Sequence, residues 1–358
     1  MRIIQIIDSL EAGGAERMAV NYANALAKQI DFSGLVATRK EGPLLAQLDA
    51  KANYFFLNKK RSFDLKAIFT LRRYVIKNNV TLVHAHSTSF FLVFLLKFIC
   101  PSIQLIWHDH YGDSEFLDKR PSLSLRIILS FFDGVISVNQ KLKQWAEEKL
   151  DCKNTIYLPN FVSTENGIMR LTFLKGAAGK RIVSLANLRP QKNHFLLLKI
   201  AKKLKETHPD WTFHLVGKDF EDDYSAAIQQ LIVEYNLKET VFVYGSKNDI
   251  QNIVEQATIC VLTSKSEGLP VALLEYGRGK KPVVVTDVGE IPAVVKNGTN
   301  GFVVSQKEEL FYVALVKLIE NEALRSDFGE AIYKVVLNHY SEEGVVKQSL
   351  NWLQKHSR

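Results

Sequence analysis

The chain has 358 residues, of which 47% are hydrophobic and 23% charged, a composition that favours well-packed soluble domains and argues against disorder. Because this length exceeds what one ordinary hydrophobic core organises, we expect two domains of about 150 to 200 residues each. The 46 basic and 38 acidic residues give a formal charge of +8, which favours phosphates, nucleic acid or an anionic membrane surface as partners. Nucleic acid is the least favoured of these, since no Cys/His finger spacing, RNP-type aromatic motif or basic heptad region occurs.

The cysteines and the first residues bear on location. Cys100, Cys152 and Cys260 lie far apart without a CxxC spacing, so we expect buried thiols in a reducing compartment and no disulfide framework or thiolate zinc site. The apolar run that follows Met1 is short and soon reaches acidic residues, unlike a signal peptide. A cytoplasmic protein is therefore expected.

Short β-rich segments alternate with longer helical segments along almost the whole chain, which is the pattern of βαβ units and parallel sheets. In the first half the predicted strands are residues 3–8, 35–38, 54–57, 82–86, 104–108, 135–138 and 155–158. In the second half they are residues 182–186, 212–216, 241–244, 259–263, 283–286 and 301–304. Two such series predict an α/β fold with two doubly wound parallel sheets, whose ligands bind beyond the carboxyl ends of the strands in a cleft between them.

A change of composition marks the domain boundary. Around residues 160–179 the periodicity is lost and Gly, Asn, Ser and Thr accumulate. We therefore expect an N-terminal domain at 1–163, a linker at 164–179 and a C-terminal domain at 180–340. A terminal helix at about 341–358 is expected to pack back on the first domain.

The nearly apolar segment 89–107 resembles a membrane span in length. Lys97 lies within it and Pro101 breaks it, which leaves roughly 11 residues of helix where ~20 are needed to cross a bilayer. A buried crossover helix followed by a strand is the expectation.

Two glutamates stand in the segment SKSEGLPVALLEYG, which begins at Ser264. Glu267 comes just before a predicted helix and Glu275 lies two turns inside it. Backbone N–H groups from Gly268 onward would form a cradle for an anion or a polar ligand, and the hydroxyls of a sugar or ribose would satisfy buried carboxylates. The alternative is that Glu267 caps the helix and Glu275 is solvated.

Two other loops carry residues suited to a phosphate ligand. Arg189 and Lys192 follow the strand at 182–186, where cations could grip a diphosphate. Gly13 and Gly14 follow the first strand and let the backbone approach a ligand closely. The GxGxxG spacing of nicotinamide and flavin enzymes is missing, and KGAAGKR lacks the residues of a P-loop.

In order and spacing these motifs resemble the retaining GT-B glycosyltransferases of family 4, over essentially the whole chain and most strongly from Ile182 to Val304. The motifs are Gly-Gly-Ala-Glu at 13–16, His108 and Asp109, Lys192 in RPQKNH, Gly217 and Gly245 after strands, Glu267 and Glu275, KPVVVTDVGEIPAVV, and NGTNGFVV. The resemblance implies a GT-B fold with two Rossmann-like domains. It also implies transfer of a sugar from a nucleotide-diphosphate sugar to a saccharide or lipid-linked acceptor in bacterial-type surface polysaccharide synthesis.

The resemblance implies a role for each matched residue. Glu267 would contact hydroxyls of the transferred sugar, Glu275 would bind the ribose, and Lys192 would neutralise the diphosphate leaving group. His108 would lie beside the sugar. The expected catalytic residues are His108, Lys192 and Glu267. The expected donor-binding residues are Gly13, Gly14, Asn187, Arg189, Lys192, Gly217, Gly245, Glu267, Gly268, Leu269, Pro270 and Glu275.

Asn187 departs from the family pattern, because an arginine usually stands directly after the small residue that ends this strand. Arg189, two positions on, either reaches the phosphate instead or is a solvated turn residue.

The remaining histidines and their neighbours receive lesser roles. Asp109, His110 and Tyr111 are expected on the acceptor side. His84 and His86 are interpreted as lying on alternate faces of their strand, as packing or polar-lining residues. His194 is expected to start a helix and not to act as a catalyst.

No DxD triplet occurs, so cations and helix-terminus donors are expected to replace a metal ion and stabilise the leaving phosphate. We expect metal-independent transfer with retained anomeric configuration by front-face displacement, no cofactor, and a UDP-sugar in preference to a GDP-sugar as co-substrate. The alternatives are a sugar-nucleotide epimerase of the same architecture and a non-catalytic nucleotide-sugar-binding protein.

The basic segment at residues 57–79 allows two interpretations. Its apolar residues recur at helical spacing and form the core face of a Rossmann helix, or its basic rim in addition faces anionic lipid. The second interpretation predicts a peripheral enzyme on the inner face of the membrane.

Overall fold

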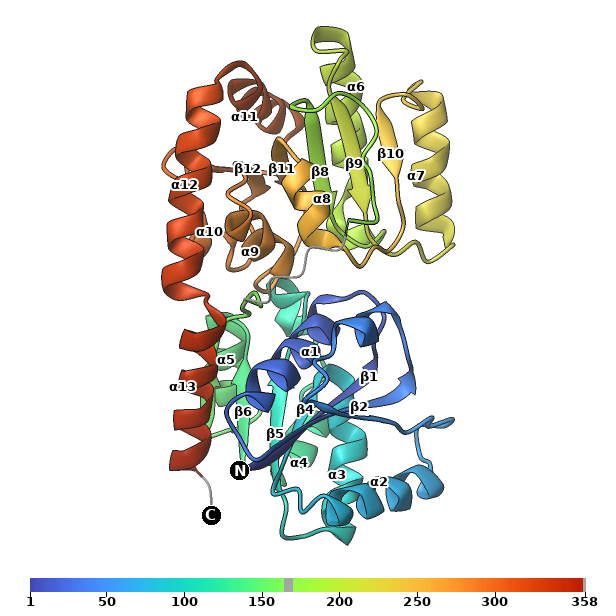
Figure 1. Ribbon diagram of the computed structural model, residues 1–358, viewed down its shortest axis with the longest axis vertical. Coiled ribbons are helices and arrows are strands. Elements are labelled where there is room, and N and C mark those ends of the chain that lie inside the picture. The colour runs from blue at the N-terminus through green and yellow to red at the C-terminus, as the bar shows by residue number, and fades with distance from the viewer. Residues whose placement is uncertain (164–169, 357–358) are drawn as a thin grey trace. The chain divides into compact units, whose positions relative to one another are not determined.

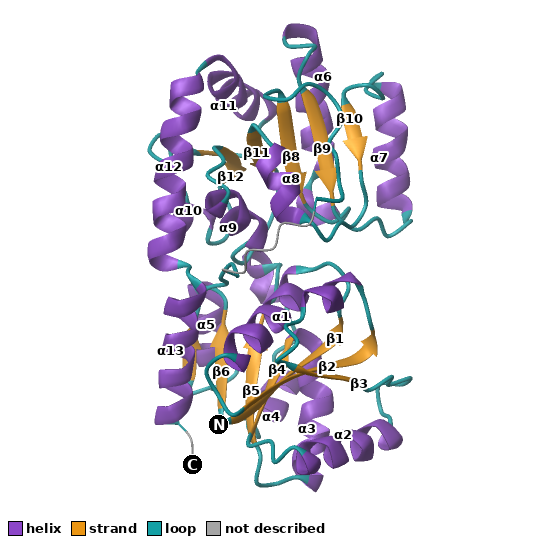
Figure 2. Cartoon of the chain, in the orientation of Figure 1, coloured by secondary structure: helices purple, strands orange, loops and turns teal. Residues whose placement is uncertain are grey.

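The computed structural model describes residues 1–163 and 170–356 and contains two compact units, Met1–Ser163 with Glu342–Arg358, and Thr164–Ser341 (Figure 1). Each unit is built around its own sheet, with helices covering both faces of the strands (Figure 2). The α/β prediction of two doubly wound parallel sheets is confirmed, because every strand pairing within the two sheets is parallel.

The first unit has a seven-stranded sheet with the order β3-β2-β1-β4-β5-β6-β7. The strands are β1 (Arg2–Ser9), β2 (Phe32–Lys40), β3 (Asn53–Phe56), β4 (Leu82–His86), β5 (Gln104–Asp109), β6 (Gly134–Ser137) and β7 (Thr155–Tyr157). The helices are α1 (Gly14–Ala27), α2 (Leu65–Lys77), α3 (Phe90–Ile99), α4 (Leu123–Leu129), α5 (Gln140–Lys149) and α13 (Glu342–Lys355), with short 3-10 turns η1 (Pro43–Gln47), η2 (Ser87–Ser89) and η3 (Ser114–Lys119).

The second unit has a six-stranded sheet with the order β10-β9-β8-β11-β12-β13. The strands are β8 (Arg181–Leu185), β9 (Thr212–Val216), β10 (Val241–Val243), β11 (Ile259–Leu262), β12 (Val283–Thr286) and β13 (Phe302–Val304). The helices are α6 (His194–Thr207), α7 (Asp223–Glu234), α8 (Ile250–Gln256), α9 (Val271–Arg278), α10 (Ile291–Val294), α11 (Glu308–Glu320) and α12 (Glu322–His339), with the 3-10 turn η4 (Pro190–Lys192).

In both sheets the strand order reverses in the middle, which decides where a ligand can bind. The chain winds outward from β1 to β3 and then resumes at β4 on the other side of β1, and β8 and β11 adjoin in the same way. Helices that leave such neighbouring strands in opposite directions open a crevice at the carboxyl ends of the strands. The loops after β8 and β11 therefore stand at the position where a doubly wound sheet binds ligands.

The apolar segment of the first unit is buried crossover structure, as the sequence predicts. α3 packs Leu92, Val93 and Leu96 into the core, and the chain then enters β5. Among the helices of the described chain, none is both long and apolar enough to span a membrane.

Residues 170–179, the described part of the expected linker, are held on the second unit. Leu171 and Thr172 donate their backbone N–H groups to Asp249 Oδ2 at 2.9 and 2.6 Å, and the Thr172 hydroxyl donates to Oδ1 at 2.8 Å. Residues 164–169 lie outside the described residues. Because Asp249 precedes α8, this contact fixes the entry of the chain to that helix.

The C-terminal helix α13 belongs to the first unit. It packs against α1, and its Trp352 lies so close to Gly134 that a Cβ at that glycine would stand 2.5 Å from the indole ring. Cys100 and Cys260 are buried free thiols and Cys152 is a half-buried one.

Candidate active site

A paired carboxylate and ammonium group lie at the carboxyl ends of β8 and β11. Lys192, in the turn η4 after β8, donates from Nζ to Glu267 Oε1 at 2.6 Å. The Ser264 hydroxyl donates to the same oxygen at 2.6 Å. The side chain of Glu267 is 6% exposed and that of Lys192 is 20% exposed. A buried charge needs such partners, so the pair can persist away from bulk water.

The structure shows the Glu267 carboxylate bound by Lys192 and Ser264. α9 begins at Val271 with Pro270 as its N-cap, three residues after Glu267. Glu275, in the second turn of α9, is half-buried and not fully solvated. Glu267 therefore directs its carboxylate toward Lys192 and Ser264, while Glu275 lies at the partly exposed side of a mostly buried helix.

Three hydrogen bonds fasten the loops after β8, β11 and β12 to one another. Lys265 donates its backbone N–H to Gln191 O at 2.7 Å, and the Thr263 hydroxyl donates to Lys192 O at 3.0 Å. The Thr286 hydroxyl, at the end of β12, donates to Ser264 O at 2.7 Å. The positions of Lys192 and Glu267 are consequently set by their backbones as well as by their ion pair.

Gly289 lies against the loop that carries Glu267. The sequence alone marks this glycine only as part of the motif KPVVVTDVGEIPAVV. Its φ is +56°, and a Cβ there would lie 2.1 Å from Glu267 O and 2.7 Å from Gly268 O. The next residue, Glu290, donates its N–H to Gly268 O at 2.9 Å. Glycine is therefore required both by the left-handed backbone and by the close approach of two loops.

A second group of predicted donor residues is linked by hydrogen bonds at the ends of β8, β9 and β10. Asn187 Oδ1 accepts the backbone N–H of Lys218 at 2.8 Å, and Gly217 donates its N–H to Gly245 O at 3.1 Å. A Cβ at Gly217 would lie 2.1 Å from Ala186 O, so only glycine permits this approach. Asn187 thus connects two loops.

Arg189 is exposed, and its guanidinium lies 4.6 Å from the centroid of the Phe220 ring. Such a cation–π contact holds the arginine near the same loops without burying its charge. Whether Arg189 reaches a phosphate stays a prediction.

His194 begins α6, two residues after Lys192. Its Nδ1 lies 3.2 Å from the Tyr224 hydroxyl, and burial, with a smaller contribution from the Lys192 charge, lowers its pKa to about 4. A neutral, buried imidazole at a helix start agrees with the structural role predicted for this residue.

In the first unit, the glycine loop is followed directly by a helix. Gly13 is the N-cap of α1 with extended backbone. A Cβ at Gly13 would lie 2.1 Å from the carboxylate of Glu16. The Glu16 carboxylate, from the first turn of α1, therefore lies against Gly13 at the carboxyl end of β1.

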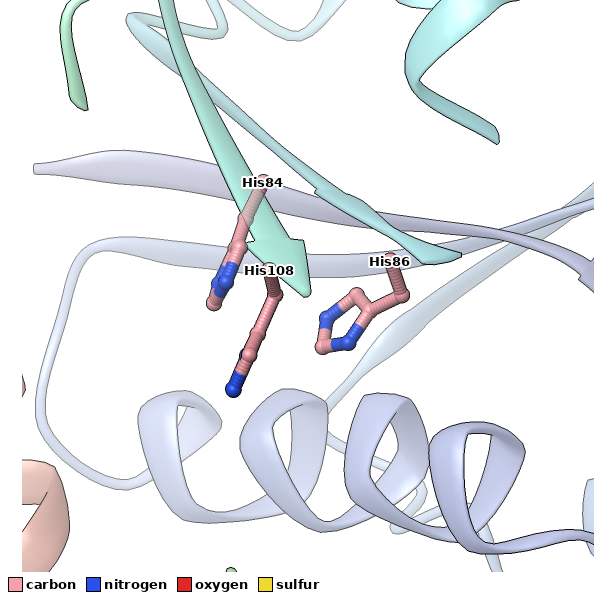
Figure 3. A group of neighbouring side chains, drawn as sticks. All are labelled: His84, His86 and His108. Carbon is pink, nitrogen blue, oxygen red and sulfur yellow. The ribbon is translucent and has the colours of Figure 1, made fainter. Parts of the chain in front are cut away.

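Four histidines gather at the carboxyl ends of β4 and β5, and the predicted placement of His84 and His86 on alternate faces is wrong. His84 and His86 lie on the same face of β4, because residues two apart in a strand project to one side. With His108 from β5 they point toward α1 (Figure 3). The rings of His84 and His108 are stacked with centroids 5.1 Å apart, and His110 follows with its centroid 4.0 Å from that of His108.

His108 is fully buried, whereas His110, just beyond the strand, is half-buried. Of the two, His110 is the histidine with surface to offer a ligand. Within the described chain, both ring nitrogens of His108 and Nε2 of His84 have no hydrogen-bond partner. Leaving a buried polar atom unpaired costs about 1–3 kcal/mol, so these atoms need an explanation. Burial also lowers the pKa of His84 to about 3, so its ring is neutral near pH 7.

Asp109, expected on the acceptor side, is bound within its own loop. Arg120 donates to both of its carboxylate oxygens, at 2.6 and 2.9 Å, and the Tyr111 N–H donates to Oδ1 at 3.1 Å. The Arg120 guanidinium also lies 4.2 Å from the centroid of the Tyr111 ring. Arg120 was not predicted, since its partner lies eleven positions away across an irregular loop.

The comparisons with known proteins agree with this arrangement. The family model described as Glycosyltransferase Family 4 matches residues 12–166, and the model described as Glycosyl transferases group 1 matches residues 173–335. The chain is 25% identical over 338 residues to the UDP-Gal:alpha-D-GlcNAc-diphosphoundecaprenol alpha-1,3-galactosyltransferase of Escherichia coli, covering 87% of this chain and 86% of that protein.

A second relative and a solved structure extend the likeness over nearly the full length. The amylovoran biosynthesis glycosyltransferase AmsD of Erwinia amylovora is 25% identical over 347 residues, covering 93% of this chain and 94% of that one. The crystal structure of Anabaena HepE in complex with UDP-glucose superposes with a TM-score of 0.81 at 17% identity, covering 99% of this chain and 100% of HepE. The chain therefore belongs to the group 1, family 4 glycosyltransferases and has their GT-B fold of two parallel-sheet units.

Proposed function

We propose that this glycosyltransferase moves a sugar from a UDP-sugar to a saccharide or lipid-linked saccharide, with retention of anomeric configuration and without a metal ion in the chemistry. The observation that carries the proposal is the buried Lys192–Glu267 pair at the carboxyl ends of β8 and β11. This is the position at which a doubly wound sheet binds a nucleotide.

The pair supplies the two charges that a nucleotide sugar requires. When the diphosphate leaves, negative charge grows on its β-phosphate, and the Lys192 ammonium, already fixed by Glu267, lies ready to neutralise it. The Glu267 carboxylate accepts hydrogen bonds from sugar hydroxyls, each charge-assisted contact contributing about 1.5–3 kcal/mol. Glu267 thereby serves as a binding group in a front-face displacement, not as a nucleophile.

The rest of the proposed donor site comes from backbone and from one further carboxylate. The buried turn Gly268–Leu269–Pro270 leads into α9, and in this proposal the backbone N–H groups of Gly268 and Leu269 donate to the sugar and the phosphates. Glu275 binds the ribose hydroxyls from its half-buried position. The loops at Gly217 and Gly245, tied by a hydrogen bond, hold the base.

UDP is the preferred carrier, because the E. coli relative is named for UDP-Gal and the HepE structure contains UDP-glucose. Surface polysaccharide synthesis is proposed because the relatives are named for a diphosphoundecaprenol acceptor and for amylovoran biosynthesis. Metal-independent chemistry is proposed because the sequence contains no DxD triplet while Lys192 and Arg189 supply cations.

A panel of UDP- and GDP-sugars tests the proposed reaction. EDTA-treated protein is incubated with each donor, with and without a lipid-linked saccharide acceptor, and UDP release and the anomeric configuration of the product are measured. We expect transfer from a UDP-sugar with retained configuration in the presence of EDTA. A strict requirement for Mg²⁺ or Mn²⁺ that Zn²⁺ does not meet, an epimerised donor, or binding without turnover would each contradict the proposal.

Substitution of Gly289 by alanine should impair the donor site through the backbone. Its Cβ would push the Glu267 and Gly268 carbonyls away, so we expect UDP affinity, measured by calorimetry, to fall at least tenfold. Gly298→Ala is the matched control, since Gly298 also has a positive φ of +74° but has open space around its Cβ position. An equal loss of UDP affinity in both variants would contradict the predicted effect of Gly289 on the loop that carries Glu267.

Lys192→Ala should lower the rate of transfer more than the affinity for the donor. The phosphate gains charge only as the bond breaks, so kcat is expected to fall by at least a hundredfold while the Kd for the UDP-sugar changes less than tenfold. Lys199→Ala, an exposed lysine on α6, controls for loss of surface charge. Equal effects on kcat and Kd would mean that Lys192 binds the donor without stabilising the transition state further.

We also propose that the first unit adheres to an anionic membrane surface through α2 and the residues before it. Ile68, Leu71 and Val75 of α2 face the core, but Phe63 and Phe69 are 58% and 51% exposed. The same stretch of chain carries five exposed basic residues: Lys60, Arg61, Lys66, Arg73 and Lys77. Near anionic lipid each such charge contributes about 1 kcal/mol, and the aromatic rings can enter the interface.

Liposome sedimentation tests this surface. The protein should pellet with anionic vesicles at low salt and be released as salt rises, because exposed charges are screened. Phe63→Ser combined with Phe69→Ser should weaken pelleting severalfold, whereas Phe173→Ser, which alters a 75% exposed phenylalanine of the second unit, should not. Recovery that is equal with neutral and anionic vesicles would leave a soluble acceptor as the better explanation.

A further inference from the structure

The histidine cluster of the first unit is buried and contains ring nitrogens without hydrogen-bond partners in the described chain, which calls for an explanation whether or not His108 also lies beside the sugar. We propose that His84, His86 and His108 bind one zinc ion, as a structural metal site between the sheet and α1. The inference goes beyond the transfer reaction, since a structural metal ion takes no part in it.

The three side chains come from neighbouring strands and converge. β4 and β5 pair in parallel with His86 opposite His108, which brings the rings to the same level of the sheet. One ring nitrogen from each histidine lies within 4.8 Å of those of the other two. In a tetrahedral zinc site with Zn–N bonds of about 2.0–2.1 Å, the ligand nitrogens lie roughly 3.3 Å apart. Small side-chain rotations would bring the three ring nitrogens to that separation. Figure 3 shows the three rings directed to one region above α1.

Unpaired nitrogens are what distinguish this cluster from an ordinary buried hydrogen-bond network. Nε2 of His84 and both ring nitrogens of His108 have no hydrogen-bond partner in the part of the chain that the structure describes. All three histidines are at most 1% exposed, so bulk water does not form hydrogen bonds with these ring nitrogens. A metal ion would use the lone pairs that a polar-lining role leaves unused.

Gln5 supplies the second interaction that a metal-binding histidine usually makes. Its Oε1 lies 2.8 Å from His86 Nε2, and an amide oxygen accepts, so His86 Nε2 carries the proton and Nδ1 has the free lone pair. A hydrogen bond of this kind orients the ring and fixes its tautomer. His86 Nδ1 now faces His110 Nε2 at 2.9 Å, so His110 is close enough to serve as the fourth ligand.

The imidazole ligands restrict which metal ions can bind at this site. All the offered atoms are nitrogens of neutral imidazoles, which suit zinc, copper, nickel and iron but not magnesium or calcium. Tyr22 of α1 covers the cluster, with its ring centroid 5.3 Å from that of His84 and 5.5 Å from that of His108. With His110 as fourth ligand the ion would have four nitrogen ligands and no coordination position left for a reacting water, which is the feature that separates a structural zinc site from a catalytic one.

Metal binding to the full-length, tag-free protein tests the inference. After treatment with a chelator and gel filtration, the protein is titrated with Zn²⁺ alone, and we expect one equivalent bound and a rise in Tm of about 5 °C or more. Co²⁺ as a substitute should give the intense visible absorption of a tetrahedral nitrogen site. Transfer activity is not the readout, so failure here is distinct from failure of the proposed reaction.

Matched variants assign the ligands. His108→Gln should weaken zinc binding at least a hundredfold, and Gln5→Leu, which removes only the supporting oxygen, about 10–100-fold. His214→Gln should leave binding unchanged, because His214 is equally buried but bonds to Thr212 and Tyr244 in the second unit.

Three results would overturn the site. They are less than a tenth of an equivalent of zinc on the wild type, no change of Tm with zinc, and His108→Gln binding as tightly as the wild type. If His108→Gln does not fold, the wild-type cobalt spectrum decides: a weak octahedral spectrum like that of aqueous Co²⁺ would refute the proposal.

Discussion

The arrangement of the second unit depends on one buried charge, the Glu267 carboxylate. A carboxylate that is 6% exposed is tolerable only with strong donors, and Lys192 and Ser264 supply them at 2.6 Å each. Those donors come from the loops after β8 and β11, so the loops must be held in register. Thr286 and Gly289 do this through contacts to backbone carbonyls. The cradle around the pair is thus rigid before a ligand arrives, as electrostatic stabilisation of a leaving group requires.

Both sheets use the same topology, yet their carboxyl ends are filled differently. In the second unit the ends of β8 and β11 carry opposite charges that pair across the reversal of strand order. In the first unit the ends of β4 and β5 carry neutral rings buried under α1. One edge therefore presents paired charges, and the other presents neutral imidazoles. The division follows from side chains alone, since the backbones are alike.

Much of this structure is readable from the sequence, because local pattern controls it. Each predicted strand overlaps an observed one, since a parallel strand buried on both faces is a short apolar run between turn residues. Glu267 and Lys192 lie in the loops that follow such runs. The contacts that were missed are set by distant partners: Gly289 by the Glu267 carbonyl, and Asp109 by Arg120. His84 and His86 were assigned to opposite faces although the period of two puts them on one.

The buried histidines of the second unit make its free energy of unfolding depend on pH. Burial lowers the pKa of His214 to about 3 and that of His194 to about 4, whereas in an unfolded chain both groups take up a proton near pH 6.5. Below that pH the unfolded state binds more protons, so each histidine lowers the free energy of unfolding by about 1.4 kcal/mol per pH unit until its folded pKa is reached. Proton uptake therefore works against the unit that carries the donor loops, and near pH 7 neither imidazole imposes that cost.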